Sequence, residues 1–165
     1  TDRMEIEIAG YLNQVADGRL SDQSKHEIHQ MLRIVSELES VGDSNFNSAR
    51  YIRNRFEGKF QYTEAQNQSV EHMFELAEKA VLHMRAMLEK NFRGTSEDDF
   101  MLATNIEHEI NNYRNMLKAQ NTMNITARQY DYLTGVNYMD IIGECEKMGD
   151  YIINVEEAVS DRKAN

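Results

Sequence analysis

Two pairs of carboxylates with the same spacing are the residues of this sequence best suited to chemistry. Glu39 and Asp43 are four residues apart, and Glu146 and Asp150 repeat that spacing 107 residues later. Residues four apart lie one turn apart on the same face of a helix, so each pair brings two carboxylates together. Oxygen ligands of this kind suit Mg²⁺, Ca²⁺, Mn²⁺ or oxidised iron, and zinc with help from histidine or water. We therefore predict metal ligation by these four residues.

The acidic pairs belong to a longer duplicated segment. Residues 34–47 (IVSELESVGDSNFN) align with residues 141–154 (IIGECEKMGDYIIN), and six of fourteen positions are identical. The repeated positions are mainly polar, whereas an ordinary bundle would repeat its apolar stripe and let the polar face vary. The positions that recur beside the acids, predicted to support the metal sites, are Gly42, Gly149, Asn47 and Asn154. Because a mid-helix glycine costs about 1 kcal/mol relative to alanine, the two glycines predict close approach of a helix or ligand.

A helical wheel places each acidic pair against the apolar face of its helix. Glu39 falls within the apolar arc and Asp43 at its edge, and Glu146 and Asp150 repeat that placement. Two carboxylates one turn apart repel each other, and the repulsion costs more when they are partly buried. The pattern therefore favours a bound cation. The other repeated acids, Glu37 and Glu144, point away from this arc and are expected on the helix surface.

The windows ELESVGD at 37–43 and ECEKMGD at 144–150 resemble the duplicated signature of the PhoU family of phosphate-signalling proteins. That signature is an acidic residue followed by Leu-Glu-Arg-Ile-Gly-Asp, with an Asn one turn later. The chain departs from it where Ser40 and Lys147 replace Arg, where Cys145 replaces Leu, and where Ser44 and Tyr151 replace a frequent His. The resemblance implies a tandem pair of three-helix bundles, with metal bound through the two Glu-x-x-x-Asp pairs.

The resemblance also implies a function. It implies a regulatory domain in phosphate transport or its control, which acts through protein contacts rather than catalysis. The implied metal is iron, zinc, manganese or magnesium. In its departures from the signature, the chain resembles the PhoU domains fused behind the membrane part of sodium/phosphate cotransporter-type proteins more than it resembles the free-standing regulator. The implied partner is therefore a phosphate transporter or a membrane domain of the same chain, at the cytoplasmic face of the membrane, and a homodimer is among the expected assemblies.

Helix start and stop signals predict an all-α, antiparallel helical bundle. Gly18 and Gly58 are expected helix ends, and Thr63 with Gln66 forms a capping box. The predicted helices are 2–17, 22–57, 63–94, 96–121 and 126–159, followed by a frayed tail at 161–165. Residues 1–165 form one domain, with one repeat at about 1–93 and the second at about 95–160. The second repeat lacks a convincing third helix, so we expect it to be incomplete or finished by another chain.

Composition excludes several classes of protein. The 165 residues include 18 basic and 28 acidic side chains, a net charge of −10, which repels nucleic acid and anionic lipid. No apolar run approaches the roughly 20 residues that span a bilayer, so direct membrane insertion is not expected. The single cysteine excludes an internal disulfide, and no signal-peptide pattern opens the sequence, which favours the cytoplasm.

Two other functions remain alternatives to a metal-binding regulator. A carboxylate-bridged di-metal enzyme would require Glu-x-x-His on two helices, and this spacing does not occur. A helical adaptor without metal would use the acidic residues only for helix register or solubility. The histidines are weak ligand candidates: His26, His29, His72, His83 and His108. Cys145 and the stripes containing Met73, Met84, Met87 and Tyr130 to Tyr138 are expected in the core.

Overall fold

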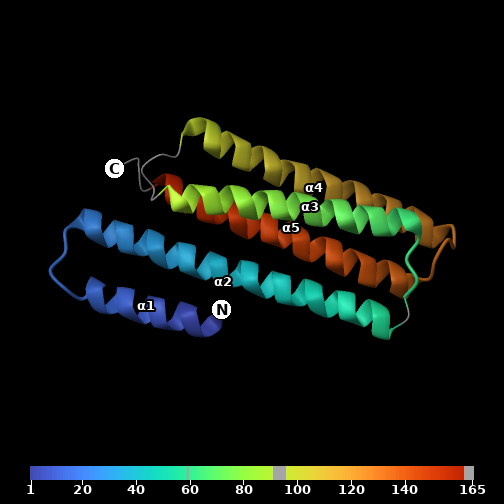
Figure 1. Cartoon of the computed structure of the whole chain (residues 1–165), viewed down its shortest axis with the longest axis horizontal. Coiled ribbons are helices and arrows are strands. Elements are labelled where there is room, and N and C mark those ends of the chain that lie inside the picture. The colour runs from blue at the N-terminus through green and yellow to red at the C-terminus, as the bar shows by residue number, and fades with distance from the viewer. Residues whose placement is uncertain (59, 91–95, 162–165) are drawn as a thin grey trace.

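The computed structural model describes residues 1–58, 60–90 and 96–161, and every regular element in these ranges is a helix. The five helices are α1 (Asp2–Ala16), α2 (Asp22–Glu57), α3 (Glu64–Glu89), α4 (Glu97–Thr126) and α5 (Tyr132–Asp161). They run roughly parallel to one long axis, and consecutive helices reverse direction (Figure 1). The predicted all-α antiparallel bundle is therefore confirmed. None of the helices in these ranges is long and apolar enough to cross a membrane.

Side-chain caps fix the starts of α2, α3 and α4 as predicted. The Ser21 hydroxyl accepts a hydrogen bond from the Ser24 N–H at 3.1 Å. A capping box begins α3 at Thr63 and another begins α4 at Ser96, each satisfying N–H groups that lack an intrahelical partner. The predicted end of the third helix at Gly94 lies outside the described residues, and α3 itself ends at Glu89.

The predicted joint between the fourth and fifth helices is wrong by about five residues. We expected α4 to end near Asn121 and Thr126 to cap the next helix. Instead the Thr126 hydroxyl donates to the Thr122 carbonyl at 2.8 Å, so Thr126 is satisfied within the last turn of α4. The chain then turns through Arg128, whose φ is 57°. Asp131 caps α5, since its Oδ1 accepts from the Thr134 N–H at 2.9 Å.

The cap at Asp131 gives a first prediction. Its hydrogen bonds from the Thr134 side chain and backbone lower the pKa of Asp131, so its stabilising effect is present above its ordinary pKa and is lost as the pH falls through the lowered value. Asp131→Ala should lower the melting temperature by a few degrees at pH 7, and the difference from wild type should shrink in acid. Thr126→Ala is the matched control, because its hydroxyl caps no helix. An equal effect of the two substitutions, measured by circular dichroism, would contradict this assignment.

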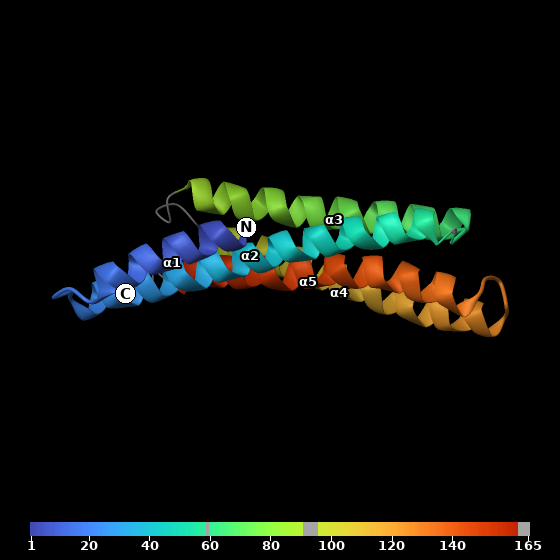
Figure 2. The same ribbon diagram turned by 90° about the horizontal axis from the view of Figure 1, so that it is seen from below.

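The core is built around α5. This helix packs against α2, α3 and α4, whereas α1 packs only against α2 (Figures 1 and 2). Its fully or almost fully buried apolar side chains include Ile141, Ile142, Cys145, Val155 and Val159. The predicted core positions Met73, Met84, Met87 and Tyr138 are buried as well. Tyr130 is half-buried and donates to Asn121, and Tyr132 is exposed.

The two duplicated segments lie side by side on α2 and α5. Three hydrogen bonds between the helices show their register: Arg33 with Glu157, Glu37 with Asn154, and the Tyr51 carbonyl with Asn137. Residue numbers rise along α2 while those of the partners in α5 fall. The helices are thus antiparallel, with the duplicated segments meeting at their middles. This arrangement relates the two duplicated segments by an approximate two-fold axis, which passes near the level of Gly42 and Gly149.

The third helix packs away from the helix that precedes it. α3 lies against α4 and α5, and the described parts of α2 and α3 make no close backbone contact. Helices α3, α4 and α5 therefore pack against one another as a three-helix group, and α2, which carries α1 on its other side, packs along α5 (Figure 1). Two tandem three-helix bundles remain a prediction for the repeats at about 1–93 and 95–160.

Candidate cation site between α1 and α2

The first acidic pair lies where the start of α1 crosses the middle of α2. Glu39 and Asp43 project from successive turns of α2, and α1 brings Asp2 to them. One carboxylate oxygen from each of the three residues lies within 4.8 Å of the others. Gly42 allows this approach, because a Cβ there would lie 2.5 Å from the Thr1 Cγ2 atom. The sequence predicted two of the three carboxylates and missed Asp2, since nothing in the sequence shows how α1 is oriented on α2.

The electrostatic environment of this cluster is unfavourable for negative charge. Burial raises the pKa of Glu39, and the neighbouring carboxylates of Asp43, Asp2 and Glu5 raise it further. Asp2 differs, because hydrogen bonds from its backbone N–H and from the Thr1 hydroxyl lower its pKa. Neither Glu39 nor Asp43 pairs with a lysine or arginine within the described ranges. A cation placed among these oxygens would relieve the repulsion.

The second acidic pair has a different environment. Glu146 forms an ion pair with Arg114 of α4, and both side chains are largely shielded from solvent. Burial raises the pKa of Asp150, Glu146 and Glu107 raise it further, and Arg114 opposes them. Arg114 thus supplies the positive charge that the first pair lacks. Metal binding by Glu146 and Asp150 stays a prediction. A metal there would have to bind beside the Arg114 guanidinium, which already pairs with Glu146.

The two acidic pairs do not meet in one site. Gly42 faces Thr1 and the α1 side of the bundle, whereas a Cβ on Gly149 would lie 3.1 Å from Ile110 of α4. Helices α1 and α4 do not contact each other in the described ranges. The predicted close approach at both glycines is therefore confirmed, but the approaching elements lie on different sides of the central α2–α5 pair.

The remaining repeated polar residues lie between α2 and α5, which corrects one expectation. We expected Glu37 and Glu144 on the helix surface, yet Glu144 is only 4% exposed and Glu37 is half-buried. Asn154 donates to Glu37 across the interface at 3.2 Å, and Lys147 donates to Glu144 at 2.9 Å. The expectation was wrong because α2 and α5 are each buried on more than one side, so one apolar arc does not describe them. Asn47, also half-buried, lies by the antiparallel register at the level of Glu144.

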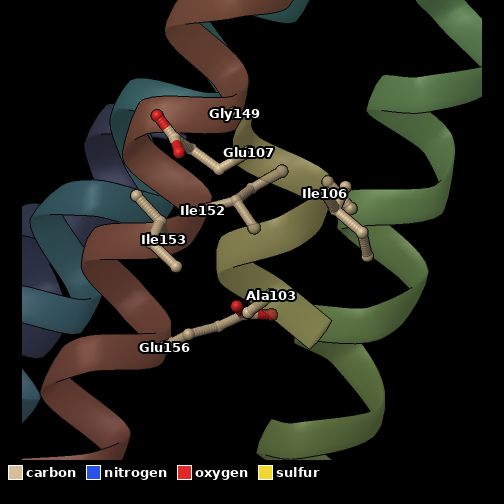
Figure 3. Close-up of a pocket in the computed structure, with 8 residues that line it drawn as sticks. Ala103, Ile106, Glu107, Gly149, Ile152, Ile153 and Glu156 are labelled. Carbon is tan, nitrogen blue, oxygen red and sulfur yellow. The ribbon is translucent and has the colours of Figure 1, made fainter. Parts of the chain in front are cut away.

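A buried polar pair that the sequence did not predict lies between α3 and α5. His83 Nδ1 is 2.8 Å from Glu156 Oε1, and Glu156 is 1% exposed. Burial raises the pKa of Glu156, while His83 lowers it by hydrogen bonding and by its charge. Glu156 also borders a small cavity of about 10 Å³, and Figure 3 shows Ile152 lying between Glu156 and Glu107 there. That volume is about one water molecule, so the cavity offers no room for an organic substrate.

The other candidate side chains lie outside the two acidic pairs. His72 contacts Glu75 at 3.1 Å and the Tyr113 ring, His29 and His108 are exposed, and His26 is half-buried beside Gln30. Cys145 is fully buried, and burial raises its pKa to about 12, which keeps the thiol protonated.

No protein-family model, curated protein or solved structure matches this chain. The PhoU resemblance therefore depends on the two short duplicated windows, 37–43 and 144–150.

Proposed function

We propose that the protein is a non-catalytic regulatory domain that binds a cation between α1 and α2. The observation that supports this proposal is the convergence of Asp2, Glu39 and Asp43, whose oxygens lie within 4.8 Å of one another without a basic partner among the described side chains. Three oxygen ligands, completed by water, suit magnesium, manganese or ferric iron, and zinc remains an alternative. The proposed metal site involves the first acidic pair, because Arg114 already neutralises Glu146.

The PhoU resemblance extends this proposal to a biological role. We infer that the domain takes part in phosphate transport or its control at the cytoplasmic face of the membrane. The acidic net charge of −10 disfavours direct binding of phosphate, so the domain would act through contacts with a transporter or with a membrane domain of its own chain. Binding of the cation would then change the charge of the surface formed by α1 and α2.

Two alternatives are less well supported. A di-metal enzyme would gather its ligands in one place, whereas Glu39 lies beside Asp2 of α1 and Glu146 pairs with Arg114 of α4. Within the part of the chain that the structure describes, α1 and α4 do not contact each other. A helical adaptor without metal would keep the same fold and leave the three carboxylates to water. A metal titration separates this adaptor from the proposed regulator.

The test is a thermal shift titration with Mn²⁺, Zn²⁺, Fe³⁺ and Mg²⁺ against a sample in EDTA. We expect at least one ion to raise the melting temperature, because a ligand that binds only the folded state stabilises it. The double variant Glu39→Gln/Asp43→Asn should lose this rise. It should also be more stable than wild type in EDTA, because the repulsion between the carboxylates is removed.

The matched control is Glu71→Gln/Glu75→Gln, which removes the same charge at the same spacing from α3. It should keep the full metal-dependent shift. The shift should weaken in acid, because protonated carboxylates do not ligate and the pKa of Glu39 is raised. No shift with any ion, or an equal shift in the two double variants, would contradict the proposed site.

A further inference from the structure

A groove separates α2 from α3 on one side of the bundle. It has a volume of about 680 Å³, and its apolar lining includes Val41 of α2, Met148 of α5, and Phe74 and Val81 of α3. Leu82 stands at its edge and is 56% exposed. Single exposed apolar residues are common on protein surfaces, but a groove lined by Leu82 together with the partly buried Val41, Phe74 and Val81 indicates a binding surface.

The apolar surface continues across α2 to α1. Met4 and Ile8 of α1 and Val35 and Leu38 of α2 line a second, smaller groove of about 130 Å³. Met4 is 66% exposed and Ile8 is 41% exposed, although they lie one turn apart on one face of α1. Leu38 lies one turn from Val41, so the two grooves occupy adjoining parts of the same face of α2. We refer to both grooves together as the α1–α2–α3 trough.

The internal repeat allows the trough to be compared with the corresponding positions of α5. In the duplication, Leu38 corresponds to Cys145 and Val41 to Met148. Cys145 is fully buried and Met148 is 5% exposed, on the helix that packs against α2, α3 and α4. Leu38 and Val41 are only partly buried: Leu38 lies beside α1 in the smaller groove, and Val41 lines the larger groove. Positions of α2 that correspond to buried positions of α5 are thus open to a further helix.

The charges around the trough indicate the chemistry of the helix that it would hold. One wall carries three acidic residues of α3, Glu71, Glu75 and Glu78. The opposite end carries Glu5 and Glu39, with Asp2 and Asp43 adjacent. A second copy of this chain is a poor occupant, because its net charge of −10 adds like charge to an acidic surface.

We propose that the α1–α2–α3 trough binds an amphipathic helix of a partner protein that carries lysine or arginine on both flanks of its apolar stripe. The apolar stripe would cover Ile8, Leu38, Val41 and Phe74, and the flanking cations would meet the acidic walls. This is the helix-in-groove mode of recognition, in which anchors recur at i, i+3 or i+4, and i+7. The inference names the kind of partner used by the proposed function, but it does not require that a metal is bound.

The test uses a fluorescein-labelled peptide of about 18 residues, ~27 Å long as a helix, with a leucine stripe and lysines on both flanks. Two further peptides replace the lysines by glutamate or scramble the order of the residues. Fluorescence anisotropy with the intact protein in EDTA should show the basic amphipathic peptide binding at least about tenfold more tightly than either control. Binding should weaken with added salt, because part of the attraction is between exposed charges.

Variants of the protein locate the binding surface. Ile8→Lys/Leu82→Lys changes two exposed residues of the trough and should weaken binding about tenfold or more, while the fold persists. Met116→Lys/Met123→Lys is the matched control, since both residues are exposed on α4 away from the trough and add the same charge. Equal binding by the two variants would show general attraction to an acidic protein and would overturn the proposal.

Two other results would also overturn it. Equal affinity for the lysine and glutamate peptides would contradict the inferred charge of the partner. A dimer in sedimentation velocity that dissociates in Ile8→Lys/Leu82→Lys would make a second copy the occupant. Because binding is measured in EDTA, a missing metal site would leave the result unchanged. Conversely, Leu82→Lys alone, which changes no residue of the groove that contains Glu39, should keep the metal-dependent thermal shift. Failure of one proposal can therefore be distinguished from failure of the other.

Discussion

His83→Ala is expected to lower the free energy of unfolding by about 3 kcal/mol. The substitution removes the only hydrogen-bond partner found for Glu156 Oε1 in the described residues, and that carboxyl is 1% exposed. Breaking a buried pair by removing one member typically costs roughly 3–5 kcal/mol. Protonation of Glu156 relieves part of this penalty, which places the expected value at the low end. Urea unfolding followed by circular dichroism at pH 7 measures it.

The control for this prediction is His72→Ala on the same helix. His72 also contacts a glutamate, at 3.1 Å from Glu75, but both side chains are about half-exposed. Exposed pairs contribute little, so a loss of less than about 1 kcal/mol is expected. His83→Gln, whose amide can still donate to Glu156, should fall between the two alanine variants. If His83→Ala costs no more than His72→Ala, the pair with Glu156 has no special energetic role.

The pH dependence of stability should identify Glu156 as the group concerned. Burial raises its pKa above the ordinary value of 4.5 in the folded state. The folded protein therefore binds more protons than the unfolded chain between 4.5 and the raised pKa, and this group makes stability fall as the pH rises through that window. Removing His83 removes an interaction that lowers this pKa, so the fall should extend to higher pH in His83→Ala. Glu156→Gln should lack this fall in stability between pH 4.5 and the raised pKa. A pH profile of stability that is unchanged in Glu156→Gln would contradict the assignment of the fall to Glu156.

The sequence predicted the helices well because their ends depend on local interactions. Ser21, Thr63 and Ser96 each bond a backbone N–H three residues away, and such bonds need no tertiary contact. Thr126 was misassigned because its hydroxyl has two local choices, a cap or a bond to the preceding turn, and the sequence does not decide between them. Asp131, a stronger capping residue nearby, begins the next helix instead.

The sequence predicted the site less completely because its remaining parts come from other helices. The i, i+4 spacing identifies Glu39 with Asp43 and Glu146 with Asp150, since both members of each pair share one helix. Asp2 comes from α1 and Arg114 from α4, and their positions depend on how those helices cross α2 and α5. The burial of Glu144 was missed for the same reason, because α5 packs against α2, α3 and α4 and the sequence does not show which of its faces they cover.

Arg114→Ala tests whether an internal cation takes the place of a metal in the second repeat. The substitution leaves Glu146, Asp150 and the nearby Glu107 without the guanidinium that pairs with Glu146. Because both members of this ion pair are largely shielded from solvent, we expect a loss of about 2 kcal/mol in the free energy of unfolding in EDTA. Arg114→Lys, which keeps the charge but not the planar fork, should lose less.

The same variant should respond more strongly than wild type to a divalent cation. Removal of Arg114 makes the second acidic pair resemble the first, so Mn²⁺ should restore part of the lost stability to Arg114→Ala and little to Arg114→Lys. Arg114→Ala/Glu146→Gln should recover stability without metal, because it removes the unpaired charge as well as its partner. If Mn²⁺ stabilises Arg114→Ala no more than wild type, then two acids one turn apart are not sufficient for ion binding in this fold. The proposed site at Glu39 and Asp43 would then depend on the contribution of Asp2 from α1.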